Sequence, residues 1–118
     1  MKELTILLTT GAMMTTGPYK ALKLAEAALD RGHSVNLFCF GEGVTVLNRR
    51  QAPKAFPNLA LMTERLIARG LKVAACRTCS IARGYGPEDL VEGAVFGKLI
   101  EDYIKFVGRS DRLIHISF

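Results

Sequence analysis

The chain has 118 residues, of which 49% are apolar and 23% charged, and this composition is typical of one ordinary globular domain over residues 1–118. Its longest apolar runs are far shorter than the roughly 20 residues that span a bilayer, and no separate apolar leader precedes the first strand-like run, so we expect a cytoplasmic protein without a membrane span. The net charge of +5 comes from basic residues spread along the chain, and no nucleic-acid-binding motif appears, so we expect no direct contact with nucleic acid.

The first half of the chain alternates strand-like and helix-like segments. Residues 3–10 are rich in Leu, Ile and Thr and predict a strand buried on both faces. A helix is expected from Pro18, which suits a first helical turn, to just before Gly32, which ends the apolar periodicity. Residues 34–40 predict a second strand, and a Gly-Glu-Gly turn closes it. Residues 44–56 fit either a short helix or a loop.

The middle of the chain repeats this alternation. Asn58 is suited to cap a helix that ends at Gly70, since the apolar residues between them recur at helical spacing. Residues 71–76 then predict a third strand, and residues 77–83 a short helical turn. The third strand therefore ends at Cys76.

The last third of the chain predicts two more strands around a helix. Residues 90–96 fit a fourth strand that Gly93 weakens, residues 99–107 fit a helix with one apolar face, and residues 112–117 fit a final strand. Strands that alternate with helices at this spacing indicate a parallel sheet with helices on both faces. Such sheets bind ligands outside the carboxyl ends of their strands, which is where Cys76 is expected to lie.

Cys76 and Cys79 form a C-x-x-C pair at this strand end. Backbone N–H groups of the following turn, with Arg77 and Arg83 near in sequence, would favour the thiolate of Cys76 and lower its pKa, giving a nucleophile at neutral pH. A buried small residue is the alternative interpretation for a cysteine at such a place. Two cysteines at this spacing in a loop shift the balance towards chemistry.

Two further interpretations of the pair have less support. A zinc site needs about four ligands, and the remaining soft donors are His33, His115 and Cys39, of which Cys39 lies within an apolar strand and is expected to pack in the core. A thioredoxin-type exchanger places its C-x-x-C after an early strand, whereas here the motif follows the third, and the chain has no Trp. A dithiol oxidoreductase nevertheless remains an alternative.

The loop after the first strand offers a different kind of site. Its residues, TTGAMMTTG, are rich in hydroxyl groups and glycine, as in loops that cradle a phosphate, although a plain turn before a helix explains them too. A nucleotide- or flavin-binding module is therefore a second alternative. If the loop instead borders Cys76, Met13 and Met14 would cover that site, with Glu42 and Tyr85 as possible neighbours.

The chain resembles the DsrE/DsrF/TusD family of sulfur-relay proteins over nearly its whole length. The resemblance is carried by the stretches LTILLTTGAMMTTGPYKALKLAEAALDRGHSVNLFCFGEGV, LIARGLKVAACRTCSIARGY, EDLVEGAVFGKLIEDYI and SDRLIHISF. Its most specific part is Cys76, eight residues before the glycine of the Arg83-Gly84 pair. The resemblance implies a flavodoxin-like three-layer α/β/α fold with a mainly parallel five-stranded sheet, in homo- or hetero-oligomers such as trimers or hexamers.

The same resemblance implies a sulfur carrier. Cys76 would accept sulfane sulfur from a donor as a persulfide and pass it to a cysteine of another relay protein, in sulfur oxidation or tRNA thiolation, without a cofactor. Cys79 is present only in some branches of the family, so it either resolves the persulfide as a disulfide, with release of sulfide, or merely lines the loop. Other relatives lack the first cysteine and are structural subunits, and the presence of Cys76 argues against that role.

Overall fold

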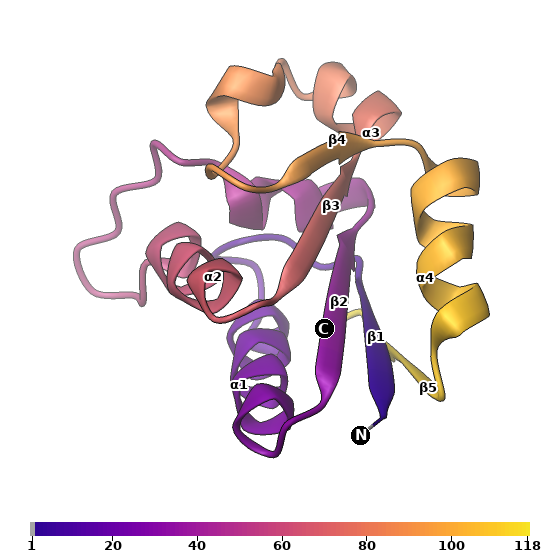
Figure 1. Ribbon diagram of the computed structural model, residues 1–118. Helices are drawn as coiled ribbons and strands as arrows, with labels where there is room; N and C mark the ends of the chain where they lie inside the picture. Colours follow the sequence, from indigo (N-terminus) through magenta and orange to yellow (C-terminus); the bar gives the residue numbers. More distant parts are fainter. Residues whose placement is uncertain (1) are drawn as a thin grey trace.

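The computed structural model describes residues 2–118, apart from the side chain of Ile100. Five strands form one sheet in the order β4-β3-β2-β1-β5, and every neighbouring pair is parallel (Figure 1). The strands are β1 (Glu3–Leu8), β2 (Ser34–Cys39), β3 (Lys72–Cys76), β4 (Val95–Gly97) and β5 (Arg112–Ile116). The predicted α/β fold with a five-stranded, mainly parallel sheet is confirmed.

Helices cover both faces of this sheet. The helices α1 (Gly17–Asp30) and α2 (Leu59–Ala68) lie side by side against one face, and α4 (Ile104–Arg109) lies against the other (Figure 1). A 3-10 helix, η1 (Gly41–Leu47), follows β2, and the short helix α3 (Arg77–Ala82) follows β3. Within residues 2–118, no helix combines the length and the apolar content that crossing a bilayer requires.

The main core lies between the sheet and α1. Leu22 and the small residues Ala21 and Ala25 are fully buried on α1, and the small side chains let the helix approach the strands closely. On the opposite face, Phe38 of β2 packs against the ring of Tyr103, with 5.2 Å between the ring centroids. Cys39, the next residue in β2, is fully buried, and burial raises the pKa of its thiol to about 12. The prediction that Cys39 packs in the core is therefore confirmed.

The fourth strand is shorter than predicted and begins later. Of residues 90–96, only Val95 and Phe96 belong to β4, and Gly97 completes it. Leu90 instead forms an antiparallel bridge with Asn48, and Gly93 has a φ of +94°, which breaks the extended backbone. The apolar character of this segment reflects burial against residues 47–48 rather than membership of the sheet.

The segment predicted as a helix over residues 99–107 consists of two parts. A π-helix, η3 (Leu99–Tyr103), leads into α4, which ends at Arg109. The apolar residues of this segment are only partly covered, because the side chains of Leu99 and Ile104 are 40% and 56% exposed. The segment 44–56, which fitted a helix or a loop, contains the end of η1 and then irregular chain up to Asn58, the residue that caps α2.

Candidate functional site

Cys76 lies at the carboxyl end of β3 and is the N-cap residue of α3. Its Sγ accepts a hydrogen bond from the backbone N–H of Cys79 at 3.4 Å, and its carbonyl oxygen accepts one from the Ser80 hydroxyl at 2.8 Å. The residue is only 4% exposed. The bond to its carbonyl oxygen therefore fixes the backbone of Cys76, and the bond from Cys79 orients its sulfur.

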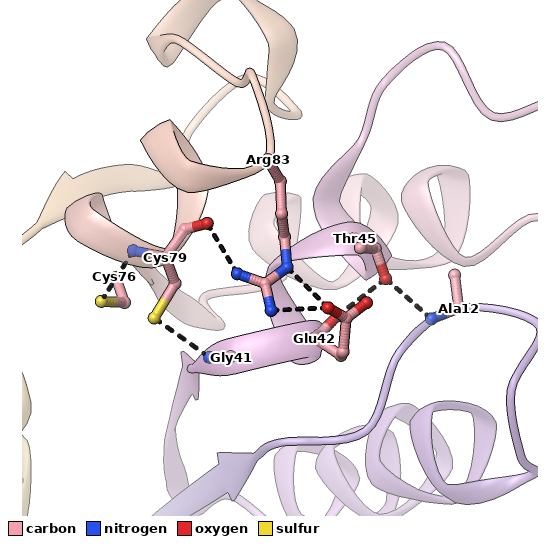
Figure 2. Close-up of polar contacts among 7 residues, drawn as sticks. All are labelled: Ala12, Gly41, Glu42, Thr45, Cys76, Cys79 and Arg83. Carbon is pink, nitrogen blue, oxygen red and sulfur yellow. Dashed lines mark hydrogen bonds and ion pairs between the residues drawn. The ribbon is translucent and has the colours of Figure 1, made fainter.

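Cys79 is more exposed than Cys76, and all three of its polar groups are engaged. Its N–H donates to the Cys76 sulfur, its own Sγ accepts the backbone N–H of Gly41 at 3.2 Å, and its carbonyl oxygen accepts an N–H of Arg83 at 2.9 Å (Figure 2). Both cysteines are free thiols. The two sulfurs thus lie at one site, as the sequence predicts, and each has a backbone N–H donor.

An ion pair between Arg83 and Glu42 closes the site on the side of η1. The Nε and Nη2 atoms of Arg83 both donate to Oε1 of Glu42, at 2.8 and 2.5 Å (Figure 2). The hydroxyl of Thr45 donates to the Glu42 carbonyl oxygen at 2.7 Å and accepts the backbone N–H of Ala12 at 2.9 Å. These contacts join the loops that follow β1, β2 and β3.

A pocket of about 620 Å³ opens over both cysteines. Phe40 and Leu99 give it apolar walls, and Arg77, Lys98 and Glu101 contribute charged side chains. The guanidinium of Arg77 also lies 5.5 Å from the ring centre of Phe96, in a cation–π contact. The volume is typical of a small-molecule site or of a site that receives a single protruding side chain.

The pKa of Cys76 shifts in the direction opposite to the one predicted. Burial raises the pKa of its thiol above the ordinary value of 9.0, and the adjacent thiol of Cys79 adds to this rise. Backbone N–H groups of Thr78 and Cys79 act in the other direction and are outweighed. The two arginines do not compensate, because Arg83 is engaged by Glu42 and by the Cys79 carbonyl, and Arg77 stacks on Phe96.

This pKa shift predicts a steep pH dependence of Cys76 alkylation. Because only the thiolate reacts, the rate with iodoacetamide should rise about tenfold per pH unit below the pKa and should level off above the range of an ordinary thiol. Trypsin separates residues 73–77 from residues 78–83, so mass spectrometry can follow the two cysteines independently. In denaturant, the pH at which the rate levels off should fall to that of an ordinary, solvent-exposed thiol. A plateau reached at a lower pH in the folded protein than in denaturant would contradict the raised pKa.

The loop after β1 does not cover Cys76, so that prediction is wrong. Met13 and Met14 line a separate groove of about 410 Å³, together with Tyr19 and Phe56. Glu42, by contrast, joins the site through Arg83. Tyr85 is half-buried and packs against the core.

The same loop offers little to a phosphate. The hydroxyls of Thr10 and Thr15 hydrogen-bond to each other at 3.0 Å, and Thr15 also accepts the N–H of Gly17 at the start of α1. A Cβ on Gly17 would lie 2.9 Å from the backbone carbonyl of Phe118, so the chain itself covers this helix start. Among the described residues, no group of three or more His, Cys, Asp or Glu side chains is arranged to hold a metal ion.

Comparison with known proteins identifies the family. The model of the DsrE/DsrF-like family matches residues 2–116. The chain belongs to the DsrE/DsrF-like family. Uncharacterized protein MJ0989 of Methanocaldococcus jannaschii is 35% identical over 112 residues, which cover 95% of this chain and 97% of that protein. Protein YchN of Escherichia coli is 32% identical over 85 residues, which cover 70% and 73% of the two chains.

Solved structures agree with this DsrE-like assignment. The crystal structure of YchN from E. coli superposes with a TM-score of 0.90 at 25% identity and covers 98% of this chain and 100% of that one. The structure of MTH1491 from Methanobacterium thermoautotrophicum, a protein of unknown function, has a TM-score of 0.72 at 16% identity, which is a likeness of fold alone. DsrE-like proteins generally take part in sulfur relay.

Sequence reasoning missed the contacts that hold Cys79. The hydrogen bond from Gly41 to the Cys79 sulfur joins residues 38 positions apart, and the Arg83–Glu42 pair joins residues 41 apart. The only signals were the Gly-Glu-Gly turn and the Arg83-Gly84 pair, and neither indicates a partner. Only the parallel packing of β2 beside β3 brings the two loops together.

Proposed function

We propose that this DsrE-like protein carries sulfane sulfur as a persulfide on Cys76. The supporting observation is the position of the Cys76 sulfur, which accepts a backbone N–H at the end of β3 beneath a pocket of about 620 Å³. The N–H donor stabilises negative charge on the sulfur while it reacts. Cys76 itself is only 4% exposed, so the outer sulfur of the persulfide would extend from it into this pocket.

The transfer is an exchange at sulfur. The Cys76 thiolate attacks the outer sulfur of a donor persulfide, R–S–SH, and the donor's S–S bond breaks as the new bond to Cys76 forms. The donor leaves as the thiolate R–S⁻, and Cys76 becomes Cys76–S–SH, so no outside oxidant or reductant is needed. A thiolate of an acceptor protein then attacks the outer sulfur of Cys76 in the same way and restores the Cys76 thiolate.

The pocket suits the approach of such a donor and acceptor. Phe40 and Leu99 give it apolar walls, and Arg77 and Lys98, beside the carboxylate of Glu101, bring positive charge towards an anionic persulfide or thiolate. Donor and acceptor are proposed to be other sulfur-relay proteins, each presenting one reactive cysteine.

The proposal is tested by locating the added sulfur. After incubation with a sulfane-sulfur donor, removal of the donor and alkylation, one extra sulfur should appear on the tryptic peptide of residues 73–77. An extra sulfur only on residues 78–83, which contain Cys79, would transfer the carrier role to that residue. No added sulfur on either peptide would refute the proposal.

A dithiol oxidoreductase is the second candidate, and the hydrogen bond between the two cysteines favours it. A thiol that accepts the N–H of the second cysteine of a C-x-x-C at 3.4 Å is well arranged for reversible disulfide formation. The two functions differ in their need for Cys79. A Cys79→Ala protein that still accepts and transfers sulfur supports the carrier and excludes the oxidoreductase.

The protein is also proposed to work as an oligomer, as the family resemblance implies. On the described part of α4, no side chain is buried, and the apolar residues Ile104 on α4 and Leu113 on the edge strand β5 are 56% and 46% exposed. Such apolar exposure at a sheet edge is typical of a surface that another subunit covers.

The mass of the protein in solution tests whether it forms an oligomer. Light scattering should give a mass that is two or more times the 12.9 kDa of one chain. Ile104→Lys should shift the protein towards the monomer, whereas Leu61→Lys should not, since Leu61 is 46% exposed on α2 at the other face of the sheet. A wild-type protein that elutes as a monomer at all concentrations would contradict the proposal.

A further inference from the structure

Cys79 can displace the sulfur that Cys76 is proposed to carry. If the Cys79 thiolate attacks the Cys76 sulfur of Cys76–S–SH, an S–S bond forms between the two cysteines and the bond to the outer sulfur breaks. The outer sulfur leaves with the bonding electron pair as HS⁻, and the proton of Cys79 has already passed to solvent. The two cysteines are oxidised to a disulfide, the carried sulfur is reduced to sulfide, and the cargo is lost.

The structure holds the Cys79 thiol in a specific hydrogen bond. Its Sγ accepts the N–H of Gly41 at 3.2 Å, so the sulfur is tied to the turn that follows β2 (Figure 2). Glu42, the next residue of this turn, is bound by two N–H groups of Arg83, whose third contact is the carbonyl oxygen of Cys79 at 2.9 Å. Arg83 therefore fastens the turn and the backbone of Cys79 to each other, and we name this pair of residues the Arg83–Glu42 clasp.

The clasp is anchored from a third direction. Thr45 binds the carbonyl oxygen of Glu42 and the N–H of Ala12, so the turn is also fixed to the loop after β1. The side chain of Arg83 is 28% exposed, and its contacts are therefore screened less than those of a fully solvated pair. Each contact holds the Gly41 N–H in place against the Cys79 sulfur.

A hydrogen-bond donor that contacts one sulfur of a dithiol shifts the equilibrium between the dithiol and the disulfide. A thiol or thiolate accepts an N–H more strongly than a disulfide sulfur does, because the disulfide sulfur carries less negative charge. A contact that is stronger in the reduced state stabilises that state and makes the disulfide harder to form. The Gly41 N–H is such a contact for the Cys76–Cys79 pair.

We propose that the Arg83–Glu42 clasp is a positioning device that keeps Cys79 reduced and bound to Gly41, and so protects the sulfur on Cys76 from release as sulfide. This role rests on the proposed persulfide function. Arg83 and Glu42 act through Gly41 and Cys79 and do not touch the transferred sulfur.

The first test measures the reduction potential of the Cys76–Cys79 pair and needs no sulfur donor. Wild type, Arg83→Leu and Glu42→Gln are equilibrated in glutathione redox buffers, and the disulfide fraction is read by alkylation and mass spectrometry. Both variants should favour the disulfide by about threefold to tenfold, the range for one lost hydrogen bond, which lowers the potential by about 15 to 30 mV. Arg83→Lys, which retains a cation, should lie between Arg83→Leu and wild type.

A matched control removes an arginine from another ion pair. Arg69 binds Asp30 at the surface, away from both cysteines, so Arg69→Leu should leave the potential at the wild-type value. Glu42→Gln preserves the side-chain shape and so keeps the test valid if Arg83→Leu fails to fold. Wild-type potentials in both Arg83→Leu and Glu42→Gln, or a potential that rises, would overturn the proposal.

The second test follows the lifetime of the persulfide. Protein loaded with sulfane sulfur and freed of donor should release sulfide about threefold to tenfold faster in Arg83→Leu than in wild type, by the same loss of one hydrogen bond, and should end as the Cys76–Cys79 disulfide. The double variant Arg83→Leu with Cys79→Ser should retain its sulfur as long as Cys79→Ser alone. If wild type takes up no sulfur, the carrier function fails, and the potential measurement still decides whether the clasp holds Cys79 reduced.

Discussion

Cys76→Ala should abolish uptake of sulfane sulfur. The alanine removes the only sulfur at the end of β3, and the Cys79 N–H and the pocket above it are left without a reacting atom. Mass spectrometry after incubation with a persulfide donor should show one added sulfur on wild type and none on the variant. The loss is complete rather than graded, because the residue forms the bond itself.

Two controls separate this loss from damage to the fold. Cys39→Ala changes a thiol that is fully buried in the core, and it should keep full uptake despite some loss of stability. Cys79→Ala should also keep uptake, since its backbone N–H still reaches the Cys76 sulfur. Equal loading of wild type and Cys76→Ala would show that the sulfur binds elsewhere and would end the assignment.

Gly43→Ala should destabilise the protein severely. A Cβ on Gly43 would lie 2.1 Å from the carbonyl oxygen of Leu8, well inside contact distance. That oxygen accepts the N–H of Phe40 at 3.0 Å, so β1 cannot move away without loss of a hydrogen bond at the end of the sheet. The free energy of unfolding, measured with urea, should fall by about 3 kcal/mol or more.

Gly108 provides the comparison. It lies in α4, and a Cβ there meets no atom within 4 Å beyond its chain neighbours and the backbone of its own helix. Gly108→Ala should leave the free energy of unfolding unchanged or raise it by up to about 1 kcal/mol, because alanine favours the helix. If Gly43→Ala proves as stable as Gly108→Ala, the close approach of η1 to β1 is not as described.

Local patterns were sufficient to predict most of the fold. The first three strands and the helices between them follow from apolar runs and glycine stops, and the structure retains each of them with ends shifted by one or two residues. The prediction of a fourth strand over residues 90–96 was wrong in its bounds because the burial of Leu90 and Val91 depends on contact with residues 47–48, far away in sequence. A π-helix at residues 99–103 has no counterpart in the apolar periodicity.

The sequence predicted where in the fold the two cysteines lie, but it did not predict their burial or their hydrogen-bond partners. Cys76 lies at a strand end, as the alternation of strands and helices indicates, and Cys79 lies beside it. The direction of the Cys76 pKa was wrong because sequence neighbours suggested charge, whereas burial has the larger effect. The side chain of Arg83 turns to Glu42, a partner that only the folded sheet provides.

The hydrogen bonds around Cys79 also connect this site to folding. The contacts from Ala12 to Thr45, from Gly41 to Cys79 and from Arg83 to Glu42 join residues 33, 38 and 41 positions apart. Contacts of this length cost more loop-closure entropy than contacts within one helix or turn, since the chain between them must be ordered. In the unfolded chain Cys76 and Cys79 are therefore two equivalent thiols, and the environment that distinguishes them exists only once β1, β2 and β3 have come together.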